Sequence, residues 1–81
     1  MMLRELDPVV LTRDFPEYGL RKGDLGAVVH VYSSTRIEVE FVRLSGATQA
    51  LVALSPDDVR SVDDKDLPAV RGAIGPARGA V

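Results

Sequence analysis

The sequence predicts an all-β protein, a small five-stranded antiparallel barrel of the SH3-like type followed by a C-terminal tail. Three observations predict this fold. Apolar residues recur with a period of two along several segments, as they do in half-buried strands. Those segments are rich in β-branched and aromatic residues, which favour strands over helices. Short turn signals separate the segments, and 81 residues leave room for one domain.

The first two strands are expected at residues 7–14 and 26–32. In 7–14 (DPVVLTRD), a proline opens the strand, and Val9 and Leu11 share one face. The second segment (GAVVHVY) alternates in the same way, which is the pattern of a strand with two different faces. Its two faces carry Ala27, Val29 and Val31 on one side and Val28, His30 and Tyr32 on the other.

Residues 36–44 (RIEVEFVRL) give the clearest strand signal in the chain. Three apolar residues point one way, and the glutamates between them point the other way. A fourth strand is expected at 48–55 (TQALVALS) and a short fifth at 58–62 (DVRSV). The alternating residues of the third strand are Ile37, Val39 and Phe41 on the apolar face and Glu38 and Glu40 on the polar face.

Turn residues divide these strands. Serine-rich pieces at 33–35 and 45–46 are typical of hairpin turns. Residues 55–58 (SPDD) place a capping serine before a proline and two acids, which is the signature of a helix start. Because few residues remain before the last strand, we expect one turn of 3-10 helix there.

The longest loop, residues 14–25, contains a glycine-rich stretch that raises the question of phosphate binding. Its glycines fit neither of the common phosphate-binding fingerprints, and a β-branched run follows where those loops need a helix. We therefore expect structural roles for this stretch. Gly23 should adopt a positive φ, Asp24 should bond a nearby amide within the turn, and Gly26 should let the chain bend into the next strand.

Composition limits the classes of function. Ten basic and twelve acidic residues give a net charge of −2, which argues against a nucleic-acid partner. The chain has no cysteine and one histidine, so neither a disulfide nor a structural metal is expected. No apolar run approaches the roughly 18 residues of a membrane span, and residues 1–7 do not resemble a signal peptide. A cytoplasmic protein is expected.

Catalytic constellations are weak in this sequence. The one base that could activate a nucleophile, His30, lies within a strand between two valines, where a structural role is the usual one. A metal site built from His30, Glu38 and Glu40 would lack further imidazole ligands. We expect a protein that is not an enzyme and that has no cofactor, metal ligand or catalytic residue.

Residues 8–62 resemble a known family, through a Val-rich first strand followed by four short motifs. They are PEYGL at 16–20, GDLGAVV at 23–29, EVEF at 38–41 and LSPD at 54–57. Their combination resembles a family of small, uncharacterised bacterial proteins, a domain of unknown function with an SH3-like barrel. The resemblance brings no established activity. It implies a stand-alone protein that sits beside toxin-like or enzyme partners, as an accessory or neutralising binder.

We expect this protein to bind another protein, with antitoxin-like or immunity-like neutralisation of a basic toxin as one form of that function. Aromatic side chains in the 14–22 loop are candidate anchors, although they could instead cap the open end of the barrel core. The acidic segment 57–66 would attract a basic partner by complementary charge. The expected partner-binding residues are Phe15, Glu17, Tyr18, Arg21, Asp57, Asp58, Asp63 and Asp64.

Two other functions remain open from the sequence. An accessory subunit of an enzyme would show the same features. A nucleic-acid-associated barrel would rely on a dispersed basic set, which nearby acids dilute. That basic set is Arg13, Arg21, Lys22, Arg36 and Arg43.

The barrel is expected to span residues 1–66 and the tail residues 67–81. In the tail, glycine, alanine and proline dominate, and the tripeptide Arg-Gly-Ala occurs twice, at 71–73 and 78–80. Such a composition is typical of a disordered segment unless something orders it. We expect contacts of the tail with a partner or with a second copy, which would make a homo-oligomer.

Overall fold

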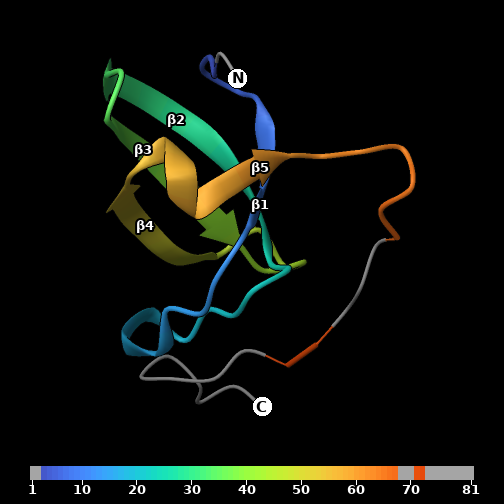
Figure 1. Cartoon of the computed structure of the whole chain (residues 1–81). Helices are drawn as coiled ribbons and strands as arrows, with labels where there is room; N and C mark the ends of the chain where they lie inside the picture. The colour runs from blue at the N-terminus through green and yellow to red at the C-terminus, as the bar shows by residue number, and fades with distance from the viewer. Residues whose placement is uncertain (1–2, 68–70, 73–81) are drawn as a thin grey trace.

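The structure is a computed structural model that describes residues 3–67 and 71–72 (Figure 1). Its described part is built of strands and short 3-10 helices, and it includes no helix with the length and apolarity needed to cross a membrane. The elements in chain order are β1 (Pro8–Leu11), η1 (Pro16–Tyr18), β2 (Leu25–Ser33), β3 (Arg36–Val42), β4 (Thr48–Leu54), η2 (Pro56–Asp58) and β5 (Val59–Ser61).

All five strands form one antiparallel sheet in the order β4-β3-β2-β1-β5. The register places Val39 of β3 opposite Val28 of β2 on one side and Val52 of β4 on the other. Strands β4 and β5 are the two edges, and η2 joins them directly in the chain. Figure 1 shows that the sheet is strongly curved. The predicted all-β fold, with a 3-10 turn before the last strand, is confirmed.

The core lies on the concave side of this sheet and follows the alternation of the strands. In β3 the three apolar residues are buried while the glutamates between them are partly exposed, as predicted. Burial of this apolar area is the main favourable contribution to folding. The core cluster consists of Val9, Leu11, Phe15, Leu20, Val28, Ile37, Val39, Phe41, Val52, Leu54 and Val59.

The first and third strands end earlier than the sequence predicted. After Leu11 the chain leaves the sheet and bonds to η2 instead, because the Thr12 N–H donates to the Asp58 carbonyl at 2.9 Å. After Val42 a turn begins, in which the Gly46 N–H donates to the Arg43 carbonyl at 2.8 Å. In both places, hydrogen bonds to turn residues replace the hydrogen bonds between neighbouring strands.

Residues 14–25 contain an element that the sequence analysis described only as a loop. Helix η1 occupies Pro16–Tyr18, with a proline at its first position and Gly19 in the left-handed conformation (φ 70°) at its end. An isolated bridge between Phe15 and Leu20 closes the base of this turn. Proline at the start and glycine at the end of a helical turn were visible in the sequence as a signal.

The glycine-rich stretch has structural roles, as expected, but the reason for a glycine at position 26 differs from the predicted one. Gly23 adopts a positive φ of 95°, and the Asp24 carboxylate accepts the Arg21 N–H at 2.8 Å, as predicted. Gly26 is required for packing rather than for a bend. A Cβ atom there would lie 2.7 Å from the Phe41 ring.

The turn before the last strand is capped as its sequence predicts. The Ser55 side chain accepts the Asp57 N–H at 3.1 Å. The Asp58 carboxylate accepts the Ser55 N–H, also at 3.1 Å, which completes a capping box.

Candidate binding groove

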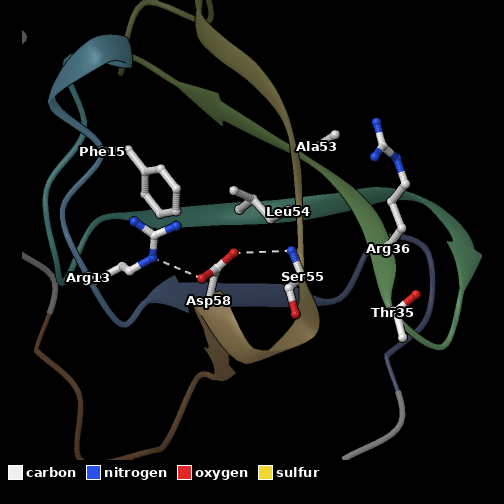
Figure 2. Close-up of a pocket in the computed structure, with 8 residues that line it drawn as sticks. All are labelled: Arg13, Phe15, Thr35, Arg36, Ala53, Leu54, Ser55 and Asp58. Carbon is white, nitrogen blue, oxygen red and sulfur yellow. Dashed lines mark hydrogen bonds and ion pairs between the residues drawn. The ribbon is translucent and has the colours of Figure 1, made fainter.

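An open groove of about 310 Å³ lies where the ends of several elements meet. The start of β3, the end of β4, η2 and the segment after β1 all contribute to it. Figure 2 shows Arg13 and Phe15 on one side, Thr35 and Arg36 on the other, and Leu54 between them. The lining residues are Arg13, Phe15, Thr35, Arg36, Ala53, Leu54, Ser55 and Asp58.

The apolar lining of the groove comes from the edge of the core. Phe15 and Leu54 are each only 5% exposed, so they present a small part of their surface to the groove. Phe15 is held by the bridge to Leu20, and Leu54 by its register opposite Ile37. This floor is therefore rigid and belongs to the folded core.

One side of the groove carries an arginine whose position is fixed. The Arg13 guanidinium carbon lies 3.9 Å from the centre of the Phe15 ring, a cation–π contact. Its Nε donates to Oδ1 of Asp58 at 3.0 Å. Because Asp58 also caps η2, this ion pair ties the segment after β1 to the turn before β5.

The opposite side of the groove carries an arginine, Arg36, that makes no cation–π contact and no ion pair among the described residues. Arg36 is exposed at the start of β3. In the part of the chain that the structure describes, no hydrogen bond or ion pair of its guanidinium is found. Figure 2 shows its side chain extending away from Thr35 at the rim. A guanidinium in this position is available to a carboxylate or another acceptor.

Of the eight residues expected to bind a partner, the structure brings two into this groove, Phe15 and Asp58. Phe15 is buried in the core, and the Asp58 carboxylate is already paired. Glu17, Tyr18 and Arg21 lie in and beside η1, outside the groove lining. Tyr18 is 41% exposed, with its ring centroid 6.4 Å from that of Phe15.

The remaining expected residues belong to the acidic segment, in which β5 separates Asp57 from Asp63 and Asp64. Asp57 in η2 is exposed, and so are Asp63 and Asp64 in the turn after β5. Asp66, in the same turn, is paired with Arg60 at 2.8 Å. The segment is thus less uniformly acidic in the folded protein than its sequence indicates.

This groove was not among the sites predicted from the sequence. Arg13 and Arg36 were expected only as two members of a dispersed basic set, whereas in the fold they lie on opposite sides of Leu54 (Figure 2). The available signals were the hairpin turn beside Arg36 and the 3-10 turn ending at Asp58. Neither signal shows that the two turns are neighbours in space.

A second polar cluster lies on the outer face of β2. The His30 and Tyr32 rings pack edge to face at 4.4 Å, and Nδ1 of His30 lies 3.5 Å from a Glu5 oxygen. The Tyr32 hydroxyl donates to Glu38 at 3.1 Å, and this hydrogen bond raises the pKa of Tyr32 above its ordinary value. No group of three or more potential metal ligands occurs in residues 3–67 and 71–72.

Comparison with known proteins gives one match. A family model described as a domain of unknown function, DUF4926, matches residues 5–61. The match covers all five strands and every residue that lines the groove. No curated protein and no solved structure matches the chain.

Proposed function

We propose that this chain, which belongs to the DUF4926 family, is a non-enzymatic module that binds a segment of a partner protein in the groove between Arg13 and Arg36. The observation that carries the proposal is the mixed lining of the groove. A rigid apolar floor at Phe15 and Leu54 lies beside a guanidinium that has no ion pair among the described residues. Binding sites for peptides and small ligands typically combine these features.

The chemistry of the lining indicates the kind of segment that fits. A volume of about 310 Å³ is at the lower end of the ~300–1,000 Å³ range of ligand sites, so it accommodates a few side chains rather than a large cofactor. An apolar side chain would rest on Leu54 and Ala53. A carboxylate of the same segment would pair with Arg36, since a guanidinium binds carboxylates through two parallel hydrogen bonds.

The proposal is tested by comparing two charge-reversed variants. Wild type, Arg36→Glu and Arg4→Glu are immobilised and used to capture proteins from cells that produce the chain, and captured proteins are quantified by mass spectrometry. The protein that Arg36→Glu loses selectively is then purified and its Kd measured by calorimetry. We expect Arg36→Glu to weaken binding by about 30-fold, the size of a typical interface hot spot.

Arg4→Glu is the matched control, because it makes the same change of charge at an exposed position outside the groove lining. Arg4→Glu should leave the Kd within about twofold, since an exposed charge away from the groove contributes little to affinity. Equal capture by all three proteins, or equal losses in both variants, would overturn the proposal. Retardation of RNA or DNA by wild type and not by Arg36→Glu would also overturn it, in favour of a nucleic-acid partner.

Neutralisation of a basic partner is a second candidate, favoured by the exposed aspartates. Asp57 and Asp64 are exposed, and their carboxylates make no hydrogen bond or ion pair within the described residues. The double variant Asp57→Asn/Asp64→Asn leaves the cap residue Asp58 intact. If the partner is basic, this variant should lower kon and its dependence on salt, because free surface charge acts mainly on encounter. Unchanged kon would contradict this role.

A further inference from the structure

The described part of the tail contains an arginine, Arg71, that docks onto the loop after η1. Nε of Arg71 donates to Oδ1 of Asp24 at 2.9 Å, and Nη2 donates to Oδ2 of the same carboxylate. Nη2 also donates to the carbonyl of Gly19 at 3.2 Å, and Nη1 to the carbonyl of Gly72 at 3.2 Å. The whole fork of the guanidinium is therefore engaged.

The acceptors for this arginine are positioned by their own loop. Oδ2 of Asp24 accepts the Arg21 N–H, and the Asp24 N–H donates to the Arg21 carbonyl at 3.0 Å. Gly23, with its positive φ, closes this turn. Gly19 is fixed by its own N–H, which donates to the Pro16 carbonyl at 3.0 Å. We name the Gly19 carbonyl and the Asp24 carboxylate together the notch.

The pair in the notch is more shielded from water than the other ion pairs described. The Arg71 and Asp24 side chains are 26% and 20% exposed, and no other pair has both partners so covered. Burial alone would raise the pKa of Asp24. The hydrogen bonds from Arg71 and from the Arg21 N–H outweigh that effect, so the pKa lies below its ordinary value. The carboxylate is thus ionised and directed at a cation.

The occupant of the notch lies outside the part of the chain that matches the family. Gly19 and Asp24 lie within the residues that match the family, whereas Arg71 lies ten residues beyond the match, which ends at residue 61. After the match, Val62 is 40% exposed and Leu67 is 86% exposed, and the ion pair between Asp66 and Arg60 holds the turn between them. A ligand tethered in this way acts at roughly millimolar effective concentration, so an external ligand can replace it.

We propose that the notch is a binding site for an arginine side chain of a protein segment, and that Arg71 fills it as a ligand supplied by the same chain. An arginine of a partner then binds there by displacing the tail. Lysine is a poor substitute because its ammonium lacks the planar fork that pairs with a carboxylate. The site is separate from the groove and does not depend on what the groove binds.

The test empties the notch and supplies a defined ligand. The 81-residue chain carrying Arg71→Ala and Arg78→Ala is labelled with ¹⁵N. These two substitutions remove the arginine of both Arg-Gly-Ala tripeptides. The labelled chain is titrated with acetyl-Arg-Gly-Ala-amide and, separately, with the lysine analogue of that peptide. We expect saturable shifts of the Gly19–Asp24 amide signals with the arginine peptide. The same peptide should bind wild type about tenfold more weakly, because the tail competes.

A matched pair of aspartate variants identifies the acceptor. Asp24→Asn, added to the double variant, keeps an oxygen for the Arg21 N–H but removes the charge, and it should abolish the shifts. Asp7→Asn is the control, because Asp7 likewise accepts an N–H three residues earlier, from Arg4 at 2.8 Å, and has no ion pair among the described residues. It should leave peptide binding unchanged.

Three outcomes would overturn the proposal. One is the absence of shifts at Gly19–Asp24 in the double variant at millimolar peptide, with dispersed spectra showing that it is folded. Another is equal binding of the lysine peptide, which would indicate a simple charge contact. The last is survival of the shifts in the Asp24→Asn variant.

Discussion

At the residue scale, one arrangement of aspartate recurs in this protein. Asp24, Asp58 and Asp66 each accept the backbone N–H of the residue three positions earlier. Each also pairs with an arginine, respectively Arg71, Arg13 and Arg60. The same carboxylate therefore shapes a turn and anchors a cation. For this reason the number of acids in the sequence overstates the free negative charge on the surface.

Asp66 provides a prediction about pH. Hydrogen bonds from Arg60 and from the Asp63 N–H lower the pKa of Asp66 to about 2. We expect Arg60→Gln to return this pKa toward its ordinary value of 3.8, because the backbone bond alone remains. The measurement is a ¹³C titration of the carboxyl signals. A wild-type midpoint close to that of an unpaired aspartate would contradict the prediction.

The sign of the linked stability effect follows from the direction of this shift. A carboxyl whose pKa is lower in the folded state stabilises it above the unfolded pKa and loses that contribution as pH falls. The contribution of the Arg60–Asp66 pair should therefore be present above about pH 4 and disappear as the pH approaches 2. In Arg60→Gln, unfolding measured by denaturant should depend less on pH within that window.

At the element scale, two glycines, one in the turn before β2 and one within β2, serve different purposes. Gly23 needs a left-handed backbone, and a Cβ there would meet nothing within 4 Å. Gly26 lies in β2, where an added Cβ would lie 2.7 Å from the Phe41 ring and 2.8 Å from the Val39 side chain. The first requirement concerns backbone conformation and the second concerns space in the core.

Substitution by alanine and by asparagine distinguishes these two requirements. Gly23→Ala should cost about 1–2 kcal/mol from its left-handed backbone, and Gly23→Asn should cost less, because asparagine tolerates that conformation. Gly26→Ala should cost about 1–3 kcal/mol by overpacking, and Gly26→Asn should cost more because it is larger. Urea unfolding measures all four. The same order of costs at both positions would show that one of the reasons is wrong.

Elements were predicted well where the signal is local. The alternation around Val39 and the cap at Ser55 depend on neighbours in the chain, and both are confirmed. Strand ends were predicted less well. The end of β1 at Leu11 depends on a hydrogen bond between Thr12 and Asp58, which lie far apart in the sequence.

At the scale of the whole molecule, the core that the described residues form lies before the expected tail. Every member of the core cluster lies between Val9 and Val59. Of the expected tail, the structure describes Leu67, Arg71 and Gly72, and the rest lies outside the described residues; contacts of the tail with a second copy stay a prediction. The described tail meets the domain through the Arg71–Asp24 pair.

Truncation after Asp66 tests whether the domain folds independently of residues 67–81. The shortened chain keeps the Arg60–Asp66 pair and loses the ion pair of Arg71, so its stability should fall by no more than about 1 kcal/mol. Thermal and urea unfolding of both chains, with the same buffer and protein concentration, give the comparison. A loss of several kcal/mol would show that residues 67–81 are part of the folding unit.

The sequence by itself determined the strands and the turns, because alternation, capping and turn chemistry act between residues close in the chain. It did not determine the candidate sites. Arg13 meets Asp58 across 45 residues, and Arg71 meets Asp24 across 47. Local pattern contains no information on which distant charges become neighbours. Only the tertiary structure decided that two arginines would lie on opposite sides of Leu54, and that a tail arginine would meet a turn carboxylate.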